Sequence, residues 1–200
     1  MRHAVTVAVA MWMLAAAVAQ AAGDAAAGKA KSNVCAACHG EDGNSTNPQW
    51  PKLAGQAPAY IVTQLQNFKQ GRRQNPLMAG IAQGLSEQDM LDLAAYFGSQ
   101  ELKLTGAADA TLAKQGQRVY RGGNAQTQVA ACMACHGPSG RGIPPRFPRL
   151  SGQHAAYTKA QLLAFKNGTR KSDGDIMTSI AFRMSQHEID ALAQYISGLH

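Results

Sequence analysis

The sequence predicts an all-α protein made of two tandem domains of one fold. The first observation is an internal repeat, because the segment WPKLAGQ at residues 50–56 recurs as FPRLSGQ at residues 147–153. The second is that apolar residues recur at helical spacing in both halves, with little of the alternation that marks strands. The third is a short motif, C-x-x-C-H, present once in each half. Together these features indicate one helical domain written twice.

The repeat extends well beyond that segment. At the same offset of 97, five more positions of the first half match the second: Tyr60, Gln64, Leu65, Phe68 and Gly71. Past two inserted residues the offset becomes 99, and the match continues to Tyr96 and Tyr195. We therefore expect a first domain at residues 22–100, a linker at 101–112 and a second domain at 113–200.

The first 21 residues have the pattern of an export signal that is removed. Arg2 and His3 precede a largely apolar run from Ala4 to Val18, and residues 19–21 (AQA) supply a small-residue cleavage site. The mature chain is expected to begin near Ala22 and to reside in the periplasm or a similar oxidising space. No later apolar run reaches the ~18 residues that a membrane span needs.

The helices can be placed from their end signals. An alanine-rich helix is expected from about Asp24 into the first C-x-x-C-H motif, followed by a loop rich in Gly, Asn and Pro. A second helix runs from Pro58, which suits a first helical turn, to a stop at Gly71. The last begins at Ser86, where SEQD approximates a capping box, and stops at Gly98. The second half is expected to repeat this order.

The repeated motif is the attachment signature of c-type haem. On one helical turn, cysteines at i and i+3 share a face, and a histidine at i+4 lies over the first of them. Two thiols can then bond to one edge of a porphyrin while the imidazole points at the iron. We expect two covalently bound haem c groups, attached through all the cysteines of the chain: Cys35, Cys38, Cys132 and Cys135.

Three other uses of paired cysteines compete with haem. A zinc site would have to bring the two halves together on one ion and would leave His39 and His136 unexplained. A thioredoxin-like redox pair belongs in an α/β context, which this sequence lacks. A structural disulfide would likewise give the adjacent histidines no role. The motif therefore favours haem.

His39 and His136 are the predicted first ligands of the two irons, and the repeat predicts the opposite ligands. Residues 22–100 contain no second histidine, so a methionine is the expected partner in that half. Met78 corresponds to Met177, whereas Met90 corresponds to an isoleucine. We therefore predict Met78 and Met177 as iron ligands, in loops ahead of the last helices, and Met90 as a core residue. Such ligation closes the iron and suits electron transfer.

Two prolines and three histidines complete the candidates. Pro51 and Pro148 each lie twelve residues after the motif histidine. Either they simply constrain the loop, or their carbonyl oxygens accept a hydrogen bond from the imidazole Nδ1 and fix its orientation. The histidines without a histidine counterpart in the other half are assigned to the surface: His154, His187 and His200.

The positive charge lies in the second half. Residues 22–100 hold six basic and six acidic side chains, whereas residues 101–200 hold twelve basic and six acidic. A basic surface suits nucleic acid, anionic lipid or an acidic protein, and export disfavours nucleic acid. We expect redox protein partners with an acidic docking surface, and peripheral association with a membrane stays open.

On these residues the chain resembles the class I cytochromes c, and across residues 22–200 it is similar to the dihaem cytochromes c4. The resemblance implies two domains, each wrapped around one covalently attached haem, with the predicted His/Met ligands and with Pro51 and Pro148 as imidazole acceptors. In such domains the first and last helices cross at a glycine and an aromatic residue, and the matching pairs are Gly28 with Tyr96 and Gly116 with Tyr195.

The resemblance implies a periplasmic electron carrier of the respiratory chain, passing single electrons towards a terminal oxidase, and not an enzyme by itself. The alternative is the dihaem subunit of a periplasmic dehydrogenase such as flavocytochrome c sulfide dehydrogenase, whose haem chemistry would be the same. A third class, a dihaem peroxidase, needs an open iron, and a methionine candidate in each half argues against it.

Overall fold

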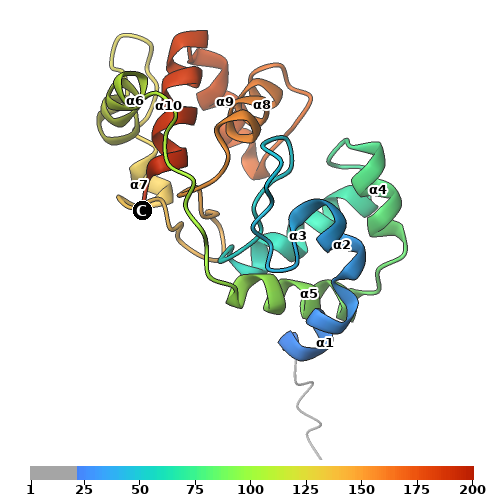
Figure 1. Ribbon diagram of the computed structural model, residues 1–200. Coiled ribbons are helices and arrows are strands. Elements are labelled where there is room, and N and C mark those ends of the chain that lie inside the picture. Colours follow the sequence, from blue (N-terminus) through green and yellow to red (C-terminus); the bar gives the residue numbers. More distant parts are fainter. Residues whose placement is uncertain (1–21) are drawn as a thin grey trace, which may run out of the picture.

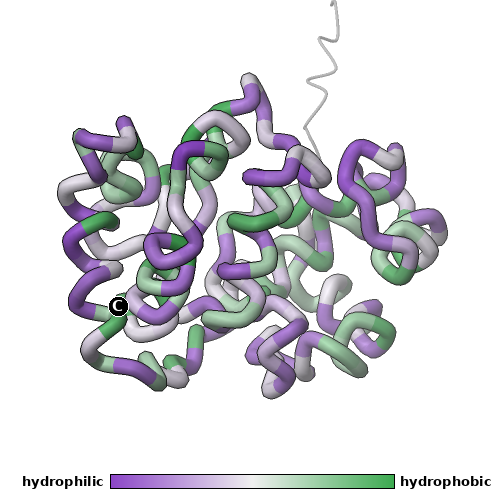
Figure 2. The backbone as a smooth tube through the Cα atoms, turned by 90° about the horizontal axis from the view of Figure 1, so that it is seen from above, coloured by the Kyte–Doolittle hydropathy of each residue, from purple (hydrophilic) through white to green (hydrophobic). Residues whose placement is uncertain are grey.

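The computed structural model describes residues 22–200, so the predicted export signal lies outside the described residues. Among these residues the regular structure is helical apart from two isolated β-bridges, which confirms the all-α prediction. Figure 1 shows two groups of helices, the first lobe and the second lobe of the molecule, joined by an extended strap. In Figure 2 hydrophobic and hydrophilic stretches alternate along the helices of both lobes.

In each lobe the first and last helices pack directly against each other, and the two middle helices pack beside them. The helices of the first domain are α1 (Ala25–Lys31), α2 (Asn33–His39), α3 (Pro58–Lys69), α4 (Pro76–Gln83) and α5 (Glu87–Ser99). Those of the second domain are α6 (Ala110–Gly122), α7 (Met133–His136), α8 (Ala155–Lys166), the 3₁₀ turn η1 (Asp173–Asp175), α9 (Ile176–Arg183) and α10 (Gln186–Gly198).

The helix ends follow the predicted signals closely in the last helices. The side chains of Ser86 and Ser185 each accept from the backbone N–H three residues on, and both capping boxes are complete. The first helix differs from the prediction, because Ser32 separates α1 from α2. Its hydroxyl donates back to the Lys29 carbonyl at 2.8 Å, which bends the backbone there. In the second domain a loop over residues 123–132 replaces that bend.

The first and last helices of each domain cross at a glycine, as the resemblance implies. A Cβ on Gly28 would lie 2.0 Å from the Asp92 carbonyl oxygen and 2.8 Å from the Cβ of Tyr96. A Cβ on Gly116 would lie 2.0 Å from the Ala191 carbonyl oxygen. Only glycine lets the two backbones approach this closely.

Each domain has its own apolar core on these crossed helices. The first core is built on α5, with Met90, Leu93 and Phe97 almost fully buried. The second is built on α10, where Ile189 and Leu192 are equally buried. Met90 therefore packs in the core, as the sequence indicates. Among the described residues, no helix has the length and apolar character needed to cross a membrane.

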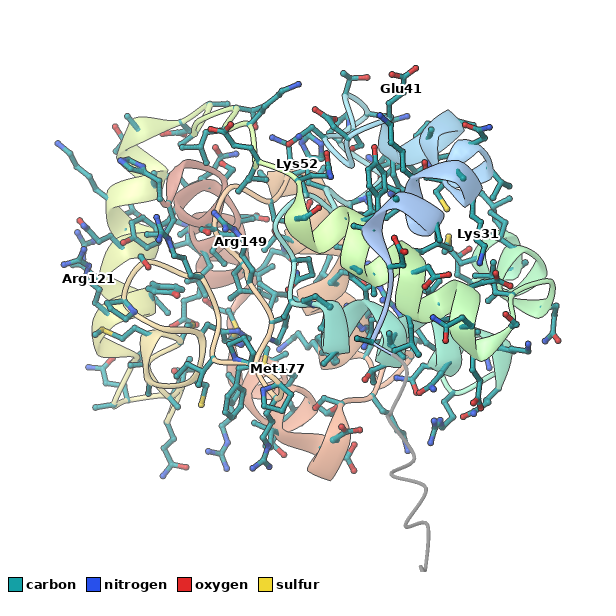
Figure 3. All side chains as sticks on the ribbon, turned by 90° about the horizontal axis from the view of Figure 1, so that it is seen from below. Lys31, Glu41, Lys52, Arg121, Arg149 and Met177 are labelled. Carbon is teal, nitrogen blue, oxygen red and sulfur yellow. The ribbon has the colours of Figure 1, made fainter. Side chains whose placement is uncertain are left out.

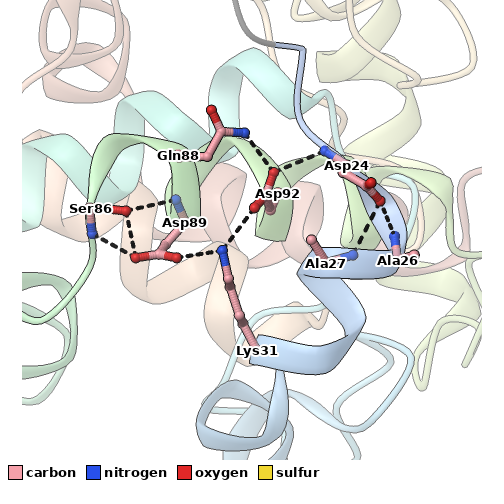
Figure 4. Close-up of polar contacts among 8 residues, drawn as sticks. All are labelled: Asp24, Ala26, Ala27, Lys31, Ser86, Gln88, Asp89 and Asp92. Atoms are coloured by element: carbon pink, nitrogen blue, oxygen red, sulfur yellow. Dashed lines mark hydrogen bonds and ion pairs between the residues drawn. The ribbon is translucent and has the colours of Figure 1, made fainter.

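A charge cluster ties α1 to α5 in the first domain (Figure 4). The Nζ of Lys31 lies 2.6 Å from Asp89 Oδ1 and 2.9 Å from Asp92 Oδ2. The other oxygen of Asp92 accepts from the backbone N–H of Asp24 at 2.9 Å. The Asp24 N–H and then Lys31 lower the pKa of Asp92 to about 2.

This cluster predicts that Asp92 makes the first domain sensitive to acid. Because its pKa is lowered in the folded protein from the ordinary 3.8, the carboxylate stabilises the fold above that value and loses its effect as the pH falls towards 2. We expect Asp92→Asn to lower the thermal unfolding temperature at neutral pH and to weaken its fall between pH 4 and 2. Asp173→Asn, at an exposed position outside the cluster, serves as the control. Identical acid profiles for Asp92→Asn and the unaltered protein would contradict this.

The two domains contact each other through equivalent residues of the repeat. The side-chain amide of Gln56 accepts from the Arg149 N–H at 2.9 Å and donates to the Arg149 carbonyl at 3.0 Å. The amide of Gln153 pairs in the same way with the backbone of Lys52, at 2.9 and 3.0 Å. The contact therefore has an approximate twofold symmetry, and it uses the two repeated segments by which the duplication is recognised.

His154 also lies in this contact, which corrects the surface assignment. His187 and His200 are exposed as expected, but His154 is only 7% exposed. Its Nε2 lies 2.8 Å from the carbonyl oxygen and 3.0 Å from the hydroxyl of Ser45 in the first domain. The assignment is wrong because the surface that buries this imidazole belongs to the other domain.

The strap between α5 and α6 is fastened to both domains. The Lys103 N–H donates to Asn44 Oδ1 at 2.8 Å, and its ammonium lies 2.6 Å from Asp42 Oδ2. Leu104 packs against Gly152 of the second domain, where a Cβ would lie 2.7 Å from the leucine side chain. Ala110, within the segment expected as linker, already begins α6.

Candidate haem sites

Short helices present the two C-x-x-C-H motifs. In the first domain α2 carries both thiols and ends at Gly40, whose φ of 80° turns the chain away directly after His39. In the second domain α7 is a single turn that ends at Gly137, with a φ of 78°. Among the described residues, no disulfide joins any of the four cysteines. Within residues 22–200, no three His, Cys, Asp or Glu residues gather in a way that would hold a metal ion, so the zinc interpretation has no support there.

Each motif histidine is buried and held by a proline carbonyl. His39 Nδ1 lies 2.8 Å from the Pro51 oxygen, and His136 Nδ1 lies 2.9 Å from the Pro148 oxygen. Because a carbonyl can only accept, Nδ1 carries the proton in each ring and Nε2 is left with a free lone pair. Burial lowers the pKa of both imidazoles, which keeps them neutral. A neutral ring with a free Nε2 is the form that binds iron.

The two matched methionines lie in short helices, which corrects their placement in loops. Met78 is in the first turn of α4, where Asn75 caps the helix by accepting from the Met78 N–H at 3.0 Å. Met177 is in the first turn of α9, and its N–H donates to Ser172 Oγ at 2.9 Å. Both side chains are half-buried against the core of their own domain.

One cavity of about 650 Å³ is lined by the cysteines and histidines of both motifs and by Met78 and Met177. Its walls are largely apolar in each domain, with contributions from Ile61, Leu65, Phe68, Leu93, Leu162, Phe165, Ile180 and Leu192. Met184 also lines the cavity, but its counterpart in the first domain is Leu85, so the repeat offers no matching thioether. The arrangement therefore brings every predicted thiol, imidazole and thioether to one continuous space.

Two cations of the cavity wall, Lys52 and Arg149, indicate whether a group with carboxylates such as haem would fit there. Lys52 is 4% exposed, and its ammonium donates only to the Lys103 carbonyl. The Nε of Arg149 is buried without a partner. Burial lowers the pKa of both side chains, and neither belongs to an ion pair between described residues. Figure 3 shows both near the middle of the molecule, with Arg121 at its outer edge.

A haem supplies what these residues lack. Its propionates are carboxylates that accept from buried cations, its vinyl edge takes two thiols, and its iron takes an imidazole and a thioether. The residues present therefore fit haem c. The sequence reasoning missed Lys52 and Arg149, although they occupy equivalent positions in the repeated PKLAGQ and PRLSGQ segments. A basic residue retained in both copies was the available signal.

Comparisons with known proteins agree with this geometry. The family model for cytochrome c matches residues 25–101 and again residues 113–200. The chain is 50% identical over 186 residues to cytochrome c4 of Pseudomonas aeruginosa, covering 92% of each chain. It is 38% identical over 169 residues to a thiosulfate dehydrogenase electron acceptor of Stutzerimonas stutzeri, covering 82% of this chain and 78% of that one. The crystal structure of reduced recombinant cytochrome c4 from Pseudomonas stutzeri is similar with a TM-score of 0.86 and 47% identity, covering 90% of this chain and 100% of that one.

Proposed function

The chain belongs to the cytochrome c family as a dihaem, cytochrome c4-type member, and we propose that it is a periplasmic carrier passing single electrons between respiratory-chain proteins, towards a terminal oxidase. It carries two covalently bound haem c groups and is an electron-transfer protein, not an enzyme by itself. When bound, each haem supplies one-electron chemistry by cycling between Fe(II) and Fe(III). The proposal is carried by the two equivalent thiol, imidazole and thioether sets that line one cavity.

The chain's own residues would hold the haems in a closed setting. Cys35, Cys38, Cys132 and Cys135 would form the thioether bonds, and His39, Met78, His136 and Met177 would ligate the irons. The carbonyls of Pro51 and Pro148 would fix the two imidazoles, and Lys52 and Arg149 would pair with propionates. With these ligands and the apolar walls in place, water and small ligands would be kept from the iron. Such a site changes its charge with little change of structure, which suits rapid electron transfer.

The second domain offers the docking surface for an acidic redox partner. Arg141 and Arg146 are exposed on the loop after the second motif, and Arg146 lines the cavity mouth. The equivalent positions of the first domain hold the uncharged Asn44 and Gln49. Positive charge beside the second haem steers an acidic surface to the point where an electron can leave.

We expect membranes that contain a terminal oxidase to reoxidise the reduced protein, with the visible spectrum reporting the rate. The double variant Arg141→Gln/Arg146→Gln should slow the reaction at low ionic strength, and the difference should vanish at high salt. Arg72→Gln, which removes an exposed charge from the first domain, is the matched control. If the reoxidation rate depended neither on ionic strength nor on the two arginines, the proposed docking surface would be wrong. If the membranes did not reoxidise the protein at all, the proposed carrier role would be wrong.

The second candidate function is the electron-accepting partner of a periplasmic dehydrogenase. The observation that favours it is the relative named as a thiosulfate dehydrogenase electron acceptor. Reduction of the oxidised protein by thiosulfate and a thiosulfate dehydrogenase, without reoxidation by membranes, would support this role over the first. Co-purification with a larger dehydrogenase subunit would likewise support the electron-accepting role.

A further inference from the structure

A polar cluster lies between the two haem sites at the domain contact. It consists of three residues of the first domain and their equivalents in the second, and we call it the arginine cluster: Tyr60, Gln64, Arg73, Tyr157, Gln161 and Arg170. The tyrosines and glutamines come from α3 and α8, and each arginine follows its helix. All six residues line the same cavity as the two C-x-x-C-H motifs.

The first arginine binds both domains. Arg73 Nη1 donates to Gln64 of its own domain at 2.8 Å. Its Nη2 donates across the contact, to the Tyr157 hydroxyl at 2.7 Å and to Gln161 Oε1 at 3.0 Å. The guanidinium is therefore held in place by two helices, one from each domain.

The second arginine repeats this pattern in the opposite direction. Arg170 Nη1 donates to Gln161 at 2.7 Å, and its Nη2 donates to the Tyr60 hydroxyl at 2.8 Å and to Gln64 Oε1 at 3.2 Å. Each glutamine oxygen thus accepts from both arginines. The two guanidinium groups are therefore equivalent under the approximate twofold symmetry of the contact, and each is bonded to both domains.

These two charges have no carboxylate partner among the described residues. Every acceptor in the cluster is a neutral oxygen, and the four ion pairs of residues 22–200 involve neither arginine. Each guanidinium instead lies over a phenylalanine ring, Phe68 or Phe165, at 4.6 Å. Arg170 is only 8% exposed. Positive charge that is neither paired nor well solvated acts over a longer range than a surface charge.

Oxidation adds one positive charge at a haem iron, and a fixed neighbouring cation opposes it. We propose that the arginine cluster is a shared electrostatic control element, in which each arginine raises the reduction potentials of both haems, including the haem of the other domain. This rests on the proposed function, because it requires a haem in each site. It also couples the two domains, because a substitution of either arginine is expected to change the reduction potentials of both haems.

The test is a redox titration of the full holoprotein carrying Arg73→Gln. We expect both potentials to fall, with a larger shift at low ionic strength. Each potential is assigned by repeating the titration in the Met177→Ala background, where the second haem loses its methionine and titrates well below the first. Arg72→Gln removes an exposed charge next to Arg73, outside the cavity lining, and should move neither potential measurably.

A conservative variant separates charge from structure. Arg73→Lys keeps the charge but loses the planar fork that spans the domains. We expect it to keep both potentials close to those of the unaltered protein while lowering the thermal unfolding temperature. Equal losses of potential in Arg73→Lys and Arg73→Gln, or a shift confined to the first haem, would overturn the proposal. If the unaltered protein lacked two haems that titrate reversibly, the proposed function itself would be wrong. If it had two such haems but Arg73→Gln left both reduction potentials unchanged, only the proposal about the arginine cluster would be wrong.

Discussion

Replacing Cys35 and Cys38 with alanine is expected to halve the covalently bound haem and to unfold the first domain. The core of that domain is small, and Cys35, Leu53 and Met78 pack against it from the side of the cavity. Without haem the apolar walls of the cavity would be exposed to water, which costs about 25 cal/mol per Å² of apolar surface. The whole stability of a small domain is only about 5–15 kcal/mol, so the loss of this contact is expected to unfold it.

Two measurements check this expectation. Haem staining after denaturing electrophoresis should show about half the colour at the mature mass, and limited proteolysis should cut within residues 22–100 while sparing residues 113–200. The mirror variant, Cys132→Ala with Cys135→Ala, should reverse the pattern. Colour that leaves the unaltered protein in acidic organic solvent would show that the haem is not covalently bound.

Replacing Met78 or Met177 with alanine is expected to open one of the two irons. Each thioether lines the cavity in the first turn of its helix, where a cap or a serine hydroxyl fixes the backbone. The charge-transfer band of methionine-bound Fe(III) should fall by about half in each variant. Carbon monoxide should then bind the reduced form, and the potential of the opened haem should drop.

The controls for this prediction come from the repeat itself. Met90→Leu and Met184→Leu change two of the methionines that lack a methionine counterpart in the other half, and both side chains are buried in the cores. Neither variant should alter the charge-transfer band or admit carbon monoxide. If Met184→Leu did so and Met177→Ala did not, the ligand assignment in the second domain would be wrong.

Features that depend only on neighbouring residues in the sequence are predictable from it. The capping boxes at Ser86 and Ser185 each involve only four consecutive residues, so the sequence predicts both helix starts. The Asn-Pro pair before Met78 predicts a loop as readily as a helix start, because the same two residues suit both. In the structure Asn75 is the cap and the proline occupies the first turn.

Features that depend on the other domain were out of reach. The burial of His154 and the cross-domain contacts of Lys52 and Arg149 arise only when the two halves meet. The repeat predicts the proposed iron ligands because each set of two thiols, an imidazole and a thioether comes from one half of the chain. The residues of the domain contact also match between the two halves. Their spacing in the sequence, however, does not show which matched positions touch the other domain.

The symmetric pairing of Gln56 with Arg149 and of Gln153 with Lys52 is the kind of contact that two identical molecules make. Free single-domain proteins that paired through such contacts would separate once diluted below their dissociation constant. Tethering by the short strap sets an effective concentration on the order of millimolar, so the halves stay together however dilute the protein is. Once assembly no longer depends on abundance, the two copies are free to diverge. Fusion thus turned a concentration-dependent pair into a permanent unit with two unlike ends, one neutral at Asn44 and Gln49 and one basic at Arg141 and Arg146.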